Sequence, residues 1–429
     1  MDAGGRVWGS AATATPFDRG EMSVGALVGA VGRAIGDVGT ERDLRSVVAV
    51  GIAGMAESGA PLDRDGGPMA PIIAWNDPRG AEVVGQLHRE FGPDLDRLIG
   101  QRLRTVSSVA KLGWLVDHGV GAVARWLGVP ELALHALTGS AATEFSLAAR
   151  TGAYDVASLG YLPEVAQAIG VAPDVFALVS PAGGAMGRIS ASGAVWSGLR
   201  RGIPVTVAGH DHLAGRAGSG AAPEDLVNSV GTAETVVLGV ATLPDVDRAL
   251  ACRVAVTVMP GGARWALLAS AARSGIVLAA VSGALGRSAE DLDRVASGAG
   301  WVEVSDVLIS AAAAGESFES QLPDGSVGAV WNGVLVALAS RGWDAVDRVR
   351  EVAGLAGADG PRLVVFGGGS RSLPWLEAKA SARPDIEVWR SGAVEAVARG
   401  AAVYAGVAAG WWSAPDDGPR PPLERVADR

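Results

Sequence analysis

A carboxylate that follows a predicted strand is the first group in the chain that could carry out catalysis. Asp211 comes after the β-branched run at residues 203–208 and before residues with a helical pattern. At a strand end a carboxylate can accept the proton of a hydroxyl group and lie near a metal ion, which suits phosphoryl transfer to an alcohol. Asp is also a favoured helix N-cap, and the spacing alone favours this structural role.

Two histidines flank this carboxylate and raise the question of a zinc site. His210 and His212 each offer an imidazole nitrogen. Side chains of sequence neighbours are expected to point in different directions, and no third ligand lies at helical spacing. We therefore do not predict zinc at this point of the chain.

Two turns contain the small residues that a phosphate-binding loop needs. Ser229-Val-Gly-Thr232 lies between two strand-like runs, where glycine lets the backbone approach a phosphate and the threonine hydroxyl can bind its oxygens. Gly367-Gly-Gly-Ser-Arg-Ser372 follows a predicted strand and precedes a helix that begins near Leu373. The second loop lacks the G-x-G-x-x-G fingerprint and the lysine of a P-loop. An ordinary hairpin turn and an ordinary strand–helix turn are the alternatives.

Two further segments could contact a sugar. Glu57 lies in the loop after a predicted strand and could bind hydroxyl groups, or it could simply be a solvated loop charge. Trp75, Asn76 and Asp77 place an aromatic ring beside two polar side chains, as many sugar sites do. A turn anchored by the tryptophan explains the same pattern.

A mixed α/β scaffold has to position these groups. Short β-branched runs alternate with alanine-rich helical patterns, which indicates an α/β architecture. Loops at the carboxyl ends of strands bind the ligands of such proteins, so we expect the turns above to form the site. We predict strands at 45–53, 203–208, 226–230, 234–240, 253–258, 264–269, 362–366 and 386–389. We predict helices at 24–38, 80–91, 111–118, 121–127, 163–169, 275–285, 289–296, 326–355, 373–383 and 394–409.

Composition excludes several other classes of protein. Of the 429 residues, 49% are hydrophobic and 19% are charged, which is incompatible with disorder of most of the chain. The apolar stretches are too short to span a bilayer, and a net charge of −10 argues against nucleic acid as a partner. Cys252 is the only cysteine, so no intrachain disulfide can form. No signal peptide is evident, and we expect a cytoplasmic protein.

The order and spacing of these motifs resembles the FGGY family of carbohydrate kinases, part of the actin-like, hexokinase-like ATPase superfamily. The resemblance covers nearly the whole chain, at residues 47–59, 68–79, 111–114, 137–139, 143–155, 203–218, 228–235, 363–372 and 395–410. It implies two ribonuclease-H-like domains with a cleft between them. The sugar-binding domain would be 1–218 and the nucleotide-binding domain 219–412, followed by a disordered, proline-rich tail at 413–429.

The resemblance also implies an activity and a role for each candidate residue. The chain would transfer the γ-phosphoryl group of ATP, with Mg²⁺, to a pentulose, hexulose or related polyol. Asp211 looks like the catalytic base and a metal ligand. The residues that look like nucleotide contacts are Gly231, Thr232, Gly275, Gly367, Gly368, Gly369, Ser370 and Ser372. The residues at the positions where members of the family contact the sugar are Glu57, Trp75, Asn76, Asp77 and His210. Family members are often dimers, so a homodimer is a further expectation.

Two features depart from the family pattern. The family opens with a strand, a D-x-G-T phosphate loop and a second strand, whereas Met1-Asp-Ala-Gly-Gly-Arg-Val-Trp8 resembles the turn after that second strand. Either the start codon is misplaced, or the chain is a truncated and impaired kinase. The second case leaves a sugar- or nucleotide-binding protein without catalysis as the alternative function. The loop Met55-Ala-Glu-Ser58 matches neither the xylulokinase-like nor the glycerol-kinase-like pattern, so the sugar stays open.

Overall fold

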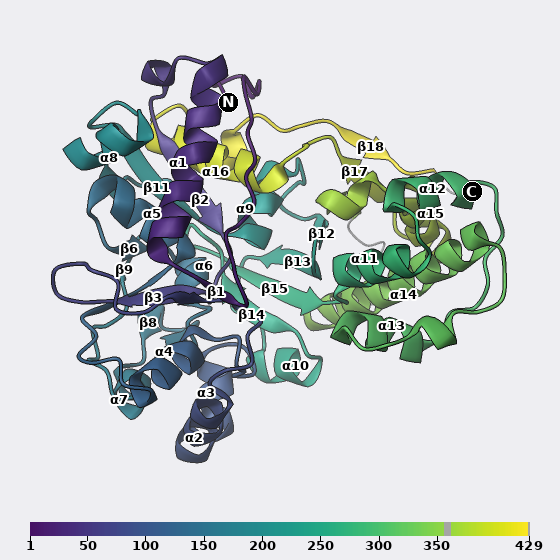
Figure 1. Ribbon diagram of the computed structural model, residues 1–429, viewed down its shortest axis with the longest axis horizontal. Coiled ribbons are helices and arrows are strands. Elements are labelled where there is room, and N and C mark those ends of the chain that lie inside the picture. Colours follow the sequence, from purple (N-terminus) through teal and green to yellow (C-terminus); the bar gives the residue numbers. More distant parts are fainter. Residues whose placement is uncertain (356–361, 428–429) are drawn as a thin grey trace.

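The computed structural model describes residues 1–355 and 362–427, and it is built around two sheets of unequal size (Figure 1). Among these residues the smaller sheet has three strands in the order β10–β11–β2. The larger sheet has seven strands in the order β14–β15–β13–β12–β16–β17–β18. The smaller sheet comes from the first half of the sequence and the larger from the second.

The smaller sheet places the end of one strand at a large cleft. Its strands are β2 (Val50–Gly54), β10 (Gly187–Arg188) and β11 (Pro204–His210). The β-branched residues of β11 are buried, and β11 pairs in parallel with β2 and antiparallel with β10. The register of the parallel pair shifts between Val207 and Gly209, as at a β-bulge. Gly209 has a φ of 113°, which glycine adopts far more easily than other residues.

Short strand pairs and helices surround this sheet. The pairs are β1 (Glu21–Met22) with β4 (Ile72–Ile73), β3 (Gly59–Leu62) with β5 (Arg125–Gly128), β6 (Ala142–Thr143) with β9 (Leu178–Val179), and β7 (Tyr154–Asp155) with β8 (Gly160–Tyr161). The helices are α1 (Val24–Glu41), α2 (Ala81–Phe91), α3 (Pro93–Leu98), α4 (Ser108–Asp117), α5 (Val129–Thr138), α6 (Phe145–Ala148), α7 (Pro163–Ala168), α8 (Ala191–Ser197) and α9 (Asp211–Gly218).

The larger sheet forms the centre of the second half. Its strands are β12 (Leu226–Val230), β13 (Glu234–Val240), β14 (Ala255–Val258), β15 (Trp265–Ser270), β16 (Leu363–Phe366), β17 (Val388–Ser391) and β18 (Leu423–Arg425). Its helices are α10 (Val246–Ala251), α11 (Ser274–Ala284), α12 (Ala289–Ala296), α13 (Asp306–Ala314), α14 (Val327–Val352), α15 (Leu373–Ala382) and α16 (Ala396–Ala408). The long helix α14 begins at the cap Ser326 and buries Trp331 and Trp343 in the main hydrophobic core.

Helix α16 connects the two halves. It packs against α9 and across β2 and β11, so this late segment lies beside the first sheet (Figure 1). Helix α16 can lie close to β2 and α9 because glycines stand where the backbones of these elements meet. A Cβ atom at Gly51 would lie 1.9 Å from the Ala401 carbonyl oxygen, and one at Gly400 would lie 1.8 Å from the Ala214 carbonyl oxygen. Larger residues at these positions would push the two halves apart.

Three sequence-based predictions were wrong. The tail predicted to be disordered is ordered over its described part, residues 413–427, because β18 pairs with β17 at the edge of the larger sheet. The helix predicted at 121–127 is replaced by β5, which pairs with β3 and buries Trp126 and Leu127. The strand predicted at 45–53 is reduced to β2, because Asp43 caps a 3-10 helix, η1 (Leu44–Ser46).

Most of the other predicted elements occur with boundaries moved by a few residues, and β12, β13 and α12 have the predicted limits. Among the described residues, no helix combines the length and apolar character that crossing a membrane requires.

Candidate active site

A cleft of about 1050 Å³ is lined by residues from both halves of the chain. Among the lining residues, those predicted to bind the sugar or to act in catalysis are Glu57, Trp75, His210 and Asp211. Residues with a predicted nucleotide role that line it are Gly231, Thr232, Gly367 and Gly368. The fold thus brings together segments that are far apart in the sequence.

Asp211 is the first residue of α9 and directly follows the last residue of β11. It is not the N-cap, because His210 occupies that position. Its side chain is 37% exposed, and its Oδ1 accepts a hydrogen bond of 2.7 Å from the His212 backbone N–H. Burial raises the pKa of this carboxyl, but His212, His210, the hydrogen bond from the His212 N–H and the charge of Arg150 together leave the pKa of Asp211 below its usual value. The group is therefore ionised at neutral pH, as a proton acceptor must be.

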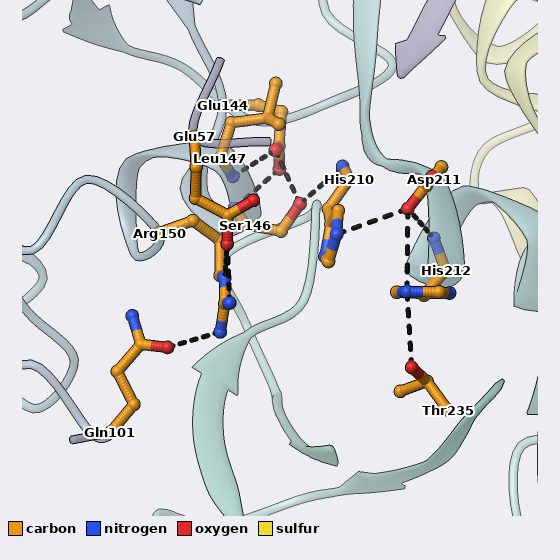
Figure 2. A network of polar contacts seen from close by, with 10 residues as sticks. All are labelled: Glu57, Gln101, Glu144, Ser146, Leu147, Arg150, His210, Asp211, His212 and Thr235. Carbon is orange, nitrogen blue, oxygen red and sulfur yellow. Dashed lines mark hydrogen bonds and ion pairs between the residues drawn. The ribbon is translucent and has the colours of Figure 1, made fainter. Parts of the chain in front are cut away.

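His210 is buried beside this carboxylate. Its Nε2 lies 3.2 Å from Asp211 Oδ1, and its backbone N–H donates to Ser146 Oγ at 3.0 Å (Figure 2). Burial lowers the pKa of His210 to about 3, with His212 and Arg150 acting in the same direction and Asp211 opposing them. A neutral imidazole next to a carboxylate favours the tautomer with its proton on Nε2. His210 is therefore placed beside Asp211 as a neutral polar group, with its Nε2 facing the carboxylate.

The two imidazoles and the carboxylate converge, contrary to our expectation for sequence neighbours. One ligand atom from each of His210, Asp211 and His212 lies within 4.8 Å of the others. The change from strand to helix between His210 and Asp211, just after the bulge at Gly209, turns the three side chains toward one point. His212 Nε2 also lies 3.3 Å from Thr235 Oγ1 of β13, so this cluster reaches the second half of the chain (Figure 2).

Glu57 is held by an ion pair within the cleft. Its Oε1 lies 2.5 Å from a guanidinium nitrogen of Arg150, and Arg150 also donates to Gln101 (Figure 2). The backbone of Glu57 has a φ of 66°, in the left-handed region that non-glycine residues seldom adopt. The Ser108 hydroxyl donates to the Glu57 carbonyl oxygen at 3.3 Å and helps to hold that conformation.

The turn at Gly231 and Thr232 connects β12 to β13 and faces the cleft. It is a hairpin turn and a cleft-lining loop at once, so the two interpretations of its sequence are compatible. Gly275 does not line the cleft but packs behind this turn. A Cβ atom at Gly275 would lie 2.5 Å from the Gly231 carbonyl oxygen and 2.9 Å from Thr232 Cα, so a side chain there would displace the turn.

The glycine loop after β16 presents two of its residues to the cleft. Gly367 has a φ of 102°, and a Cβ atom there would lie 2.5 Å from the Val230 carbonyl oxygen. A Cβ atom at Gly368 would have no neighbour within 4 Å, so its face is open.

The remaining residues of that loop support it. Gly369 packs on Val230, and the Ser370 hydroxyl donates to the Gly367 carbonyl oxygen at 2.7 Å. The Ser372 hydroxyl accepts from Trp375 N–H at 3.4 Å and caps α15. Gly369, Ser370 and Ser372 are therefore placed to shape the loop, not to line the cleft.

Asn76 and Asp77 also lie outside the set of cleft-lining residues. Asp77 forms an ion pair with Arg79 at 2.8 Å, and Lys111 donates to the Asp77 carbonyl oxygen. These contacts fix the turn that carries Trp75, which does line the cleft. The structure therefore places Asp77 in a supporting position behind the tryptophan.

Several arginines in the cleft were not found from the sequence. Those that line it are Arg102, Arg104, Arg150, Arg253, Arg341, Arg348 and Arg371. The carboxylates that line it are Glu57, Asp211, Asp344 and Glu395, so the cleft carries an excess of positive charge. In Gln101-Arg-Leu-Arg104 the two arginines are two positions apart, and Gln101 and Leu103 are buried while both arginines are exposed.

Comparisons with known proteins define the class. Residues 10–218 match the sequence model of the "FGGY family of carbohydrate kinases, N-terminal domain". L-fuculokinase of Escherichia coli (strain K12) is 33% identical over 192 residues, which are 42% of this chain and 39% of that protein. Glycerol kinase of Thermococcus gammatolerans is 28% identical over 132 residues, 29% of this chain and 27% of that protein. The chain thus spans less than half the length of these curated relatives.

Solved structures share the whole fold. A xylulose kinase from Rhodospirillum rubrum superposes with a TM-score of 0.74 at 20% identity, covering 97% of this chain and 87% of that one. Plasmodium falciparum glycerol kinase with ADP gives 0.76 at 16% identity, covering 97% and 88%. The predicted fold class, an α/β protein of the actin-like ATPase type, is confirmed. By this sequence match, the first half of the chain, residues 10–218, is assigned to the FGGY family of carbohydrate kinases.

Proposed function

We propose that this protein is an ATP-dependent kinase that phosphorylates a hydroxyl group of a pentulose, hexulose or related polyol. The observation that carries the proposal is the shared cleft. One ionised carboxylate, Asp211, faces the same space as the open turn at Gly231 and Thr232 and the open glycine at Gly368. A proton acceptor and two backbone loops suited to phosphate and nucleotide are the parts that phosphoryl transfer to an alcohol requires.

The transfer step assigns one task to each group. An oxygen of the Asp211 carboxylate accepts the proton of the acceptor hydroxyl as that oxygen forms its bond to the γ-phosphorus. The bond from the γ-phosphorus to the bridging oxygen breaks, and ADP leaves with the electron pair. His210, whose Nε2 lies 3.2 Å from the carboxylate, helps to position it, and the Gly231–Thr232 amides and hydroxyl stabilise charge on the transferred group. Closure of the two halves would exclude water as a competing acceptor.

The residues present are compatible with Mg²⁺. Asp211 is a partly exposed carboxylate in the cleft, and Mg²⁺ prefers oxygen ligands and keeps several waters. Asp211 would hold the ion, directly or through water. When bound, Mg²⁺ supplies positive charge to the phosphates of ATP.

A coupled assay for ADP tests the proposal. The full chain should produce ADP from Mg·ATP only when a suitable ketose or polyol is present, and the product should carry one phosphate by mass spectrometry. ADP formation that does not depend on any acceptor would instead indicate an ATPase. Binding of a sugar and of ATP without turnover would favour a non-catalytic binding protein.

A further inference from the structure

An arginine without a partner lies at the sugar side of the cleft. Arg104 lines the cleft and is exposed there, and among the described residues its guanidinium has no hydrogen bond or ion pair. The backbone around it is fixed, because Leu103 N–H donates to Asp96 Oδ1 at 2.8 Å and Ser107 N–H donates to the Arg104 carbonyl oxygen at 3.0 Å. The loop thus holds the residue in place while its charged group is free to bind a ligand.

The Glu57 carboxylate, which acts electrostatically on Arg104, is already paired with another arginine. Glu57 is bound to Arg150 at 2.5 Å, so these two charges neutralise each other. Arg104 lies within electrostatic reach of both, and burial and the charge of Arg150 lower its pKa while Glu57 raises it. An arginine nevertheless stays charged at neutral pH. Arg102 of the same loop also lines the cleft without a partner among the described residues, and it adds to the excess of positive charge.

The charged groups on the sugar side of the cleft lie within electrostatic range of one another. The charge of Arg150 acts on Asp211, on His210 and on Arg104, so all three lie within electrostatic range of that guanidinium. Figure 2 shows His210 between the Glu57–Arg150 pair and Asp211. Asp211, Glu57, Arg150 and Arg104 line the same cleft, so an acceptor whose hydroxyl lies at Asp211 shares that space with the Arg104 guanidinium. A neutral polyol would leave the Arg104 charge uncompensated.

We propose that Arg104 forms an anion subsite, and that the acceptor is a sugar acid or sugar phosphate whose anionic group binds there. The inference rests on the proposed kinase function and specifies its substrate class. Guanidinium matches the planar carboxylate group in a bidentate geometry and binds phosphate oxygens equally well. The γ-phosphate of ATP is the competing occupant, and the experiment has to separate it from the acceptor.

The test uses matched acceptors of equal chain length. Aldonates of three to six carbons are compared with the corresponding alditols, and ketose phosphates with the corresponding ketoses, in the ADP assay with saturating Mg·ATP. The acid or phosphate should have the higher kcat/KM in at least one pair. Arg104→Gln should lower that value by about 10- to 100-fold, mainly through KM, because a charge-assisted hydrogen bond is lost. The kcat/KM of the neutral partner should fall by a smaller factor than that of the acid or phosphate, the KM for ATP should stay close to the wild-type value, and Arg104→Lys should keep part of the affinity.

Controls keep the two proposals distinguishable. Arg64→Gln removes another exposed arginine of the first half, outside the cleft, and should behave as the wild type. Calorimetric titration of the same acids and phosphates without ATP measures the subsite even if no acceptor is phosphorylated, in which case only the kinase proposal fails. Neutral acceptors that bind and react as well as their acids would overturn the anion subsite. So would an Arg104→Gln variant whose defect is confined to the KM for ATP.

Discussion

Lys379 Nζ lies 2.6 Å from Glu234 Oε1, and the two side chains are only 2% and 0% exposed. Glu234 is the first residue of β13, directly after the cleft-lining turn at Gly231 and Thr232. Its other oxygen accepts a hydrogen bond of 2.7 Å from Ser274 Oγ, where α11 begins. This buried pair therefore connects the proposed phosphate turn to α15 and α11.

Removing one partner of this pair should strongly destabilise the protein. Lys379→Met would leave the Glu234 carboxylate buried without its counter-charge, at a cost of about 3–5 kcal/mol in the free energy of unfolding. Urea denaturation measures the change. The double variant Lys379→Met with Glu234→Gln should recover much of the loss, because no buried charge remains. Equal stability of Lys379→Met and wild type would show that the pair makes no net contribution.

Asp211→Asn should abolish phosphorylation while nucleotide still binds. The amide keeps the shape of the side chain but cannot accept the hydroxyl proton, so kcat should fall by at least about 10²-fold, the scale of a positioned general base. Steady-state assays give kcat, and calorimetry gives the ATP affinity of the same variant. Near-wild-type turnover on the best acceptor would show that another group takes the proton.

The sequence was sufficient for the fold class and singled out several of the residues that line the cleft. Strand runs such as β12 and β13 were predictable because β-branched residues and turn residues alternate locally, and glycine loops after strands indicated ligand contacts. The ordered tail was not predictable in this way. Its strand β18 depends on pairing with β17, which only the folded sheet provides.

The polar contacts of the site could not be predicted from local sequence patterns either. Glu57 and Arg150 form a pair across 93 positions of sequence, and no spacing rule indicates such a contact. The convergence of His210, Asp211 and His212 depends on a strand end, a bulge and a helix start at consecutive residues. The sequence-based expectation that neighbouring side chains point in different directions holds for a regular strand or helix. It fails at residues 210–212, where a strand changes to a helix just after the bulge.

Gly368→Val should weaken ATP binding without unfolding the protein. No atom lies within 4 Å of a Cβ at this position, so the protein itself has room for a side chain, but the added group would occupy the proposed nucleotide space. We expect the KM for ATP to rise by at least about 10-fold, the effect of losing about 1.4 kcal/mol of binding. The acceptor KM and the melting temperature should stay close to the wild-type values.

The matched control for this substitution is Gly36→Val. Gly36 also has open space around its Cβ position, but it lies in α1, away from the cleft. A parallel loss of ATP and acceptor affinity in Gly368→Val, with a lower melting temperature, would indicate a folding defect and contradict the assignment of the loop.

Glu144 should make stability depend on pH. Its buried carboxylate accepts hydrogen bonds from the Ser146 N–H at 2.8 Å, the Ser146 hydroxyl at 2.5 Å and the Leu147 N–H at 2.6 Å. Burial nevertheless dominates these bonds and raises the pKa of Glu144 from 4.5 to about 7. Ser146 Oγ in turn accepts the His210 N–H, so the titrating group lies two hydrogen bonds from the proposed catalytic segment.

The direction of the effect follows from proton binding. Between pH 4.5 and 7 the folded protein holds a proton on Glu144 that the unfolded chain has released. Stability from this group is therefore fully present below pH 4.5 and is lost as the pH rises through about 7, a change of about 3 kcal/mol at about 1.4 kcal/mol per pH unit. Glu144→Gln cannot titrate, so the difference in unfolding free energy between wild type and variant should decrease from pH 5 to pH 8. Glu131, a nearby acid whose pKa burial also raises, is present in both proteins, and its charge contributes to the raised pKa of Glu144. Urea denaturation curves at each pH give that difference, and two parallel profiles would show that Glu144 does not titrate in this range.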